Sequence, residues 1–367
     1  MRCQISPRDG ADAAVRIILH TGVWKTGSTA IQTFLSANAG LLADRGVLIP
    51  GYARRMAEYN HLFERLVAED ASGVQAVLDD IRADVAAQNP DVVVISSEHF
   101  WHAPKHIIEC VAHHLSEITT DIKVIAYIRP QDDMWASLYA QQAKFFRVLP
   151  GHSIWGASDY IGSAISDHAL YYHRCFQVYR DAFGEDAVDL RLYDRANFAD
   201  GDVVQDFLAW IGVQDRTGFV SSEKDENSSF GWKGVAFSLW LADRMNRGVA
   251  EFENSKAAGK ALRFAMRDTG RRFDDVSWYG KAPECFGPDE RARIRNHYAN
   301  DTAALARDYF DGESPFGPPP ERAAEPLSLD LVPEQEFAFA KRRLRRRIAA
   351  TYPLLSRGRW LLKPEQT

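Results

Sequence analysis

Apolar runs and polar turns alternate along the first half of the chain. Short stretches rich in valine and isoleucine end in turns with glycine or polar residues, and patterns at helical spacing lie between them. Runs such as VVVISS and KVIAYIR are apolar at successive positions, as expected of strands that helices cover on both faces. The pattern predicts an α/β fold, a three-layer sandwich around a parallel sheet of about five strands. The predicted strands are residues 15–20, 47–50, 92–97, 122–129 and 188–193.

Helical patterns fill the intervals between these strands. The segment STAIQTFLSANAGLLADRG predicts one helix that ends at Gly46, and from about Val203 the chain becomes mainly helical. The proline-rich stretch SPFGPPPERAAEP marks the end of the compact domain. We therefore expect a flexible N-terminus over 1–14, one domain over 15–315 with a helical region over about 203–312, and a linker with a basic tail over 316–367.

Composition and charge are those of an ordinary globular protein. The 367 residues include 44 Lys and Arg against 50 Asp and Glu, a formal net charge of -6, so no global charge favours a nucleic-acid partner. The 4 cysteines show no metal-ligand spacing, which favours free thiols in a reducing compartment. The N-terminus has no signal-peptide pattern, and no apolar run approaches the ~20 residues of a membrane span. These features predict a cytoplasmic protein.

The stretch IILHTGVWKTGSTAIQTFL joins the first strand to the first helix and has the composition of an anion-binding loop. Backbone N–H groups at a helix N-terminus favour an anion. Gly22 and Gly27 permit close backbone approach, Lys25 adds a charge, and the hydroxyls of Ser28 and Thr29 can donate to phosphate oxygens or cap the helix. A capped turn without a ligand is the alternative interpretation.

The order of residues differs from that of a nucleotide-triphosphate loop. In the motif G-x-x-x-x-G-K-[ST] the lysine follows the second glycine, whereas Lys25 precedes Gly27. A triphosphate site also needs an acid for magnesium at the end of a neighbouring strand. ISSEHFW offers Glu98 for that role, but AYIRPQDD ends its strand in Arg129, which indicates a second anion contact instead.

These motifs resemble those of sulfotransferases that use 3'-phosphoadenosine 5'-phosphosulfate (PAPS). HTGVWKTGSTAIQTFL is similar to their 5'-phosphosulfate-binding loop, and YIRPQDDMWASLY offers Arg129 and Ser137 in the relation that binds the 3'-phosphate in that family. Softer similarities, including LLADRGVLIP, ISSEHF and NDTAALARDYF, extend to about Pro315 and point to the bacterial carbohydrate sulfotransferase group. Trp24 departs from the family pattern, in which smaller or polar residues are common.

The resemblance implies a P-loop-NTPase-like sulfotransferase fold and metal-independent, in-line transfer of a sulfonate from PAPS to a hydroxyl of a carbohydrate or glycolipid. Lys25 then acts on the leaving group, and Arg129 and Ser137 bind the 3'-phosphate. Tyr193 resembles an adenine-contacting position, with a core aromatic as the alternative. The 5'-phosphate and the sulfonate are surrounded by Thr26, Gly27, Ser28 and Thr29.

Two residues compete for the role of general base. His61 follows the second strand, where the family tends to place acceptor-side residues, and an ordinary imidazole has a pKa near neutrality. Glu98 at the end of the third strand is the rival. Each also has a structural interpretation, as a half-buried histidine on a helix or as an ion-pair partner.

Two alternative functions stay open. A P-loop-type kinase would share the architecture, and a non-catalytic module would share the anion site. The basic segment 341–347 is either a solvated tail or a contact with an acidic glycan or an anionic membrane surface, such as the inner face of a membrane.

Overall fold

The structure is a computed structural model that describes residues 15–51, 59–145, 160–162, 170–220, 229–246, 255–280, 282–325 and 327–351. The predicted flexible N-terminus and the last residues of the predicted tail, 352–367, lie outside this description. The chain divides into two compact units, each built from separate stretches. The first comprises Met1–Pro130, His168–Glu223 and Tyr298–Gly317, and the second comprises Gln131–Asp167, Lys224–His297 and Pro318–Thr367.

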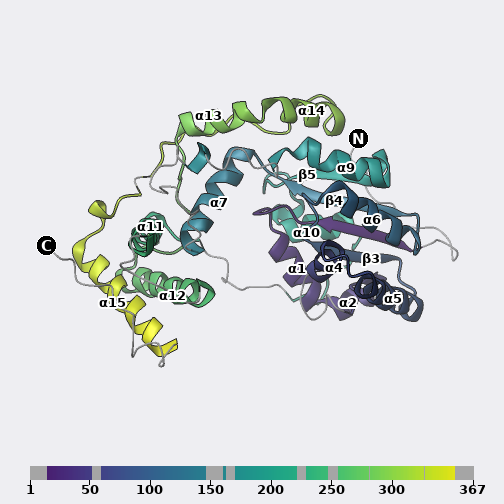
Figure 1. The fold of residues 1–367 in the computed structure, drawn as a ribbon, viewed down its shortest axis with the longest axis horizontal. Coiled ribbons are helices and arrows are strands. Elements are labelled where there is room, and N and C mark those ends of the chain that lie inside the picture. Colours follow the sequence, from purple (N-terminus) through teal and green to yellow (C-terminus); the bar gives the residue numbers. More distant parts are fainter. Residues whose placement is uncertain are drawn as a thin grey trace. The chain divides into compact units, whose positions relative to one another are not determined.

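A parallel sheet of five strands forms the centre of the first unit (Figure 1), which confirms the predicted α/β class. The strand order is β2-β3-β1-β4-β5, and all four strand pairs are parallel. Successive residues of β1 and β3 are buried because helices cover both faces, which is why their runs are apolar without alternation. The strands are β1 (Arg16–Thr21), β2 (Val47–Leu48), β3 (Val92–Ser97), β4 (Ile122–Ile128) and β5 (Val188–Leu192).

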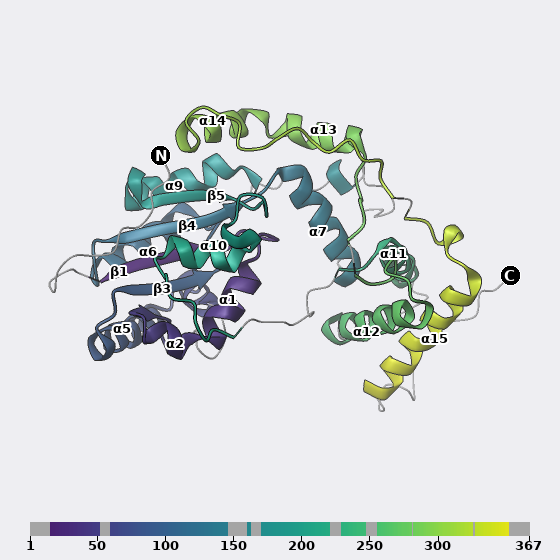
Figure 2. The same ribbon diagram turned by 180° about the vertical axis from the view of Figure 1, so that it is seen from behind.

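Helices lie on both faces of this sheet (Figures 1 and 2). Helices α1 (Ser28–Ala37) and α10 (Val203–Trp210) pack together on one face. The other face carries α4 (Asn60–Val67), α5 (Ala71–Gln88), α6 (Lys105–Ser116) and α9 (Tyr172–Phe183). The short α2 (Ala39–Ala43) lies beside β2, and α14 (Ala299–Tyr309) packs on α9. The result is the predicted three-layer arrangement.

The first helical segment is interrupted, where the sequence predicted one helix up to Gly46. The break is at Asn38, which separates α1 from α2. Its side-chain amide donates to the carbonyls of Phe34 and Val220, and its Oδ1 accepts from the Val220 N–H at 2.7 Å. The Asn38 side chain therefore pairs with the backbone of Val220 as a neighbouring backbone segment would. Because Val220 is far away in the sequence, no local pattern predicts this contact.

The described elements of the second unit are mainly helical, as expected of the C-terminal part. Its long helices are α7 (Gln131–Phe145), α11 (Trp232–Asn246), α12 (Ser255–Phe273), α13 (Pro288–His297) and α15 (Glu334–Thr351). The segment DERARIRNHYANDTAALARDYF forms two helices, α13 and α14, with Tyr298 between them.

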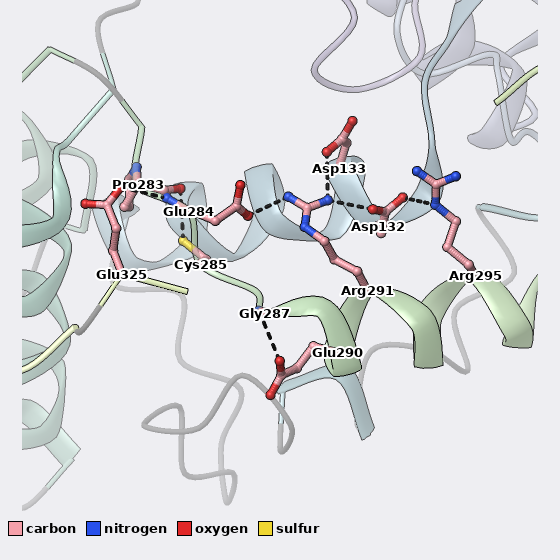
Figure 3. A network of polar contacts seen from close by, with 10 residues as sticks. All are labelled: Asp132, Asp133, Pro283, Glu284, Cys285, Gly287, Glu290, Arg291, Arg295 and Glu325. Atoms are coloured by element: carbon pink, nitrogen blue, oxygen red, sulfur yellow. Dashed lines mark hydrogen bonds and ion pairs between the residues drawn. The ribbon is translucent and has the colours of Figure 1, made fainter. Parts of the chain in front are cut away.

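A chain of ion pairs joins the start of α7 to α13 within the second unit (Figure 3). The Arg291 guanidinium contacts Asp132 at 2.5 Å, Asp133 at 2.9 Å and Glu284 at 2.5 Å, and Arg295 contacts the other oxygen of Asp132. Arg291 and Asp132 are buried, and two acids in the first turn of α7 also suit the helix dipole. The first turn of α7 is thus held firmly by its own unit.

The basic segment expected as a tail is part of helix α15, which packs on α12. Ala340, Leu344 and Ile348 recur at helical spacing and are buried, so the segment has an apolar stripe beneath its arginines. At the N-terminal end of α15, Lys233 bridges Asp275 and Glu336 at 2.7 Å each. Packing of this stripe explains why the segment is ordered.

None of the described helices combines the length and the hydrophobicity that crossing a bilayer requires. Cys110, Cys175 and Cys285 are free thiols, and Cys3 lies outside the described residues. A cytoplasmic location stays a prediction.

Candidate active site

The topology of the sheet singles out the carboxyl ends of β1 and β4. After β1 the chain leaves toward β2 on one side, and after β4 it leaves toward β5 on the other, although the two strands are neighbours. Ligands of open parallel sheets bind in the crevice outside the carboxyl ends of strands at such a position. The loop that contains Lys25 follows β1, and Arg129 follows β4, so both predicted cations lie at this position in the topology.

The loop between β1 and α1 turns through two left-handed backbone positions. Lys25 has a φ of 59° and Gly27 a φ of 82°. Helix α1 begins directly after Gly27, and its first hydrogen bonds run from the N–H groups of Ala30 and Ile31 to the Gly27 carbonyl. The amides that precede Ala30 have no acceptor within the helix, so they are available to an anion.

Both glycines of the loop are required by their surroundings. A Cβ on Gly22 would come within 2.6 Å of the Cβ of Ser28. A Cβ on Gly27 would lie 3.0 Å from the Tyr193 ring and 2.9 Å from Val203. The Tyr193 ring therefore lies against the loop, and its contact with an adenine stays a prediction.

The three hydroxyl residues of the loop have different surroundings. The Thr26 hydroxyl donates to the Val23 carbonyl at 2.7 Å, and the side chain is buried. Thr26 can therefore offer an anion its amide, while its hydroxyl holds the loop. Ser28 is buried behind Gly22, and Thr29 is exposed at the start of α1.

Three charged groups meet at the loop. Arg129 Nη1 lies 3.4 Å from the Lys25 carbonyl oxygen. Lys25 is exposed as a residue, yet desolvation of its ammonium lowers its pKa, the Arg129 charge lowers it further, and Glu98 acts in the opposite direction. The Cα of Glu98 is 3.7 Å from a Cβ built on Gly22, which places this acid beside the loop. Two cations that lie close together and repel one another favour the binding of a polyvalent anion.

The end of β3 fixes the start of α4 beside this group. The Tyr59 N–H donates to the Ser96 carbonyl at 2.8 Å, and the Ser97 hydroxyl donates to Asn60 Oδ1 at 2.6 Å. His61 follows Asn60 directly. Desolvation, with a smaller effect of the Arg65 charge, lowers the pKa of His61 to about 4. The imidazole is therefore neutral at neutral pH but no more basic than an ordinary carboxylate.

Aromatic residues not assigned a role from the sequence surround the loop. The Trp24 ring packs edge-on against Trp101 at 5.2 Å and against His102 at 4.9 Å. Trp101 also contacts Tyr172, whose hydroxyl donates to the Arg129 carbonyl at 3.0 Å. Tyr172 thus positions the end of β4. In the sequence, only the YIRP and WK motifs pointed to this part of the site. The aromatic partners of Trp24 could not be predicted because they come from distant segments of the chain.

Ser137 lies on α7, in the second unit, and is half-buried. Its predicted contact with a 3'-phosphate stays a prediction.

One group of the described residues could hold a metal ion, and it is not part of this site. His113, His114 and Glu117 offer ligand atoms within 4.8 Å of one another near the C-terminal end of α6. Because α6 runs back against the direction of β3, its C-terminal end lies at the opposite edge of the sheet from the loop.

Comparisons with known proteins add little to this geometry. No protein-family profile and no curated protein matches the chain. A solved structure of a sulfotransferase from Alicyclobacillus acidocaldarius aligns over 80% of this chain and 96% of its own, with 13% identity and a TM-score of 0.38. At that level of similarity, the function has to be inferred from the site.

Proposed function

We propose that this protein is a sulfotransferase that moves the sulfonate of PAPS to a hydroxyl group of a carbohydrate or glycolipid acceptor. The observation that carries the proposal is that Lys25 and Arg129 lie close together at the loop after β1, where their positive charges repel each other. A bound anion with several negative charges offsets this repulsion. PAPS has a phosphosulfate and a separate phosphate, so it offers one anionic group to each cation.

The residues present fit such a ligand. The loop amides at the start of α1 suit a phosphate close to the backbone. Lys25 is placed to neutralise charge that develops on a phosphate leaving group, and its partial desolvation strengthens that interaction. Arg129, with Ser137 as the predicted partner, would hold the 3'-phosphate.

PAPS supplies a sulfonate on a good leaving group, and transfer to a hydroxyl releases one proton. Glu98 is the better placed of the two candidate bases because its charge already acts on Lys25. An ordinary imidazole would be a better base than a carboxylate because its pKa is near neutrality, but the pKa of His61 is lowered to about 4. We therefore assign the role of general base to Glu98 and the positioning of the acceptor to His61.

Calorimetry with adenosine 3',5'-bisphosphate, and separately with ATP and magnesium, tests the binding step. The bisphosphate is expected to bind more tightly. Lys25→Ala and Arg129→Ala should each weaken it by roughly 10- to 100-fold, because each removes a charge-assisted contact worth about 1.5–3 kcal/mol. Lys105→Ala, at an exposed cation on α6, is the matched control.

Transfer of radiolabelled sulfonate from PAPS to a panel of sugars then tests the chemistry. Tighter binding of ATP with magnesium would assign the site to a kinase. Binding of the bisphosphate without transfer to any acceptor would favour a non-catalytic module.

A further inference from the structure

Helices α12 and α15 of the second unit pack against each other (Figures 1 and 2). Both helices are rich in positive charge. The stretch Lys260 to Arg272 of α12 has five Lys and Arg against one acid, and the stretch Phe337 to Thr351 of α15 has six against none. The whole chain, by contrast, has 44 such cations against 50 acids. We call the cationic side chains of these two stretches the basic surface.

The cations of the two helices interleave where the helices meet. Arg343 and Arg347 of α15 both donate to Asp268 of α12. The guanidiniums of Arg267 and Arg347 lie 4.8 and 4.9 Å from the centre of the Phe264 ring. Contacts from both helices to the same two residues make the basic surface continuous across the helix pair.

Part of the basic surface faces solvent, and the stretch of α15 that carries it, Phe337 to Thr351, contains no acid. Arg342, Arg345 and Arg346 follow one another at helical spacing on the side of α15 opposite its buried stripe, and all three are exposed. On α12, Lys260, Arg271 and Arg272 are exposed. Guanidiniums spread along the outside of a helix cannot converge on one small anion, but they suit an extended array of anions.

Exposed apolar side chains accompany the charge. Val276, just after α12, is 70% exposed, and Leu331, just before α15, is 55% exposed. The two segments are tied together by Lys233, which bridges Asp275 and Glu336. Aliphatic side chains beside arginines gain free energy at a bilayer interface, whereas a hydrophilic polyanion in solution offers them nothing.

We propose that the basic surface of α12 and α15 binds the face of a bilayer that contains anionic phospholipids. The headgroup phosphates supply the array of anions, and the exposed aliphatic residues reach the interface. Each cation near an anionic bilayer strengthens binding about fivefold, and the attraction is screened within a Debye length. Binding is therefore expected to be reversible and salt-sensitive. The proposal is independent of the transferase assignment.

Co-sedimentation of the full chain with vesicles tests this inference. The chain should bind phosphatidylcholine vesicles that contain roughly one-third phosphatidylglycerol, and should not bind pure phosphatidylcholine. The triple variant Arg342→Gln, Arg345→Gln, Arg346→Gln should bind on the order of 100-fold more weakly. A second triple variant, Lys105→Gln, Arg174→Gln, Arg322→Gln, removes the same charge at exposed positions elsewhere and should bind like the wild type.

Several outcomes would overturn the inference. These are failure of the wild type to bind the anionic vesicles at low salt, equal binding by the two triple variants, or tighter binding of a soluble acidic polysaccharide than of the vesicles. Circular dichroism confirms that the variants keep their helices. Binding of adenosine 3',5'-bisphosphate should be unchanged in the first triple variant, which separates this surface from the candidate active site.

Discussion

Single residues at the loop after β1 act on each other through charge. Glu98 raises the pKa of Lys25, while desolvation and Arg129 lower it. The negative charge of Glu98 beside an anion site opposes anion binding. The proposed role of Glu98 as the proton acceptor for the acceptor hydroxyl would account for a carboxylate at this position.

Glu98→Gln separates binding from chemistry. Because the variant removes a negative charge near the anion, adenosine 3',5'-bisphosphate should bind as tightly as before or more tightly by calorimetry. The kcat for sulfonate transfer should fall about 10²- to 10⁴-fold, as for loss of a general base. His61→Gln is the comparison variant. If Glu98→Gln keeps full kcat while His61→Gln loses it, the base is His61.

The proximity of the charged residues at the loop could be predicted from the sequence, but the surroundings of each side chain could not. Lys25, Arg129 and Glu98 follow strands, and parallel strands bring their carboxyl ends to one edge, so their proximity followed from the topology. The Thr26 hydroxyl is occupied by Val23, and the pKa of His61 is lowered by burial. Both effects depend on packing that residue types alone do not specify.

Among the elements, β5 and α10 support the loop from one side. Asp206 on α10 accepts from Arg191 Nε and Nη2 of β5 at 2.8 Å each, and from the Tyr127 hydroxyl of β4 at 2.9 Å. Val203, at the start of the same helix, lies against Gly27. A buried ion pair thus fixes the helix that borders the anion site.

Asp206→Asn should loosen α10. Burial raises the pKa of Asp206, but its hydrogen bonds with Arg191 outweigh this, and the net pKa lies below its ordinary value. Breaking a buried pair costs about 3–5 kcal/mol, so urea should unfold the variant at a lower concentration. Hydrogen exchange should also accelerate in Val203–Trp210. Asp79→Asn, which breaks an exposed pair on α5, is the control. Equal effects of the two variants would contradict the role of α10.

The elements themselves were largely predictable. β1, β3 and β4 are mainly apolar runs between turns, and burial on both faces makes such runs conspicuous, whereas β5 has the sequence VDLRL and is buried only at Leu190. The break at Asn38 and the docking of α15 were not predictable, because both depend on partners far along the chain. Asn38 bonds Val220, and Arg343 bonds Asp268.

For the whole molecule, acid stability depends on a histidine in the core of the first unit. His20 on β1 is buried, with Nδ1 2.8 Å from the Ser96 hydroxyl in a hydrogen bond and its ring against Phe207. Burial lowers its pKa to about 4. Unfolding exposes the imidazole, whose pKa then returns to about 6.5. The unfolded chain therefore binds one more proton than the folded chain between these two values.

The free energy of unfolding should consequently be fully retained above pH about 6.5 and fall as the pH drops toward about 4, by about 3 kcal/mol from this group. His61 contributes in the same direction. Urea titrations at several pH values measure the slope. His20→Gln should remove about half of it, since the pKa of His61 is lowered to a similar value, and His113→Gln, at an exposed histidine, should leave the slope unchanged. An unchanged slope in His20→Gln would show that His20 does not control the acid limb.

Lys25 adopts a left-handed backbone conformation that costs a residue with a Cβ about 1 kcal/mol and that glycine adopts freely. Lys25→Gly should thus melt at a higher temperature than Lys25→Ala, although both lose the ammonium. Differential scanning calorimetry compares them, and equal melting points would show that the loop relaxes. A screen for heat resistance alone would therefore select Lys25→Gly, which removes a side chain of the proposed active site. Such a screen has to select for turnover as well.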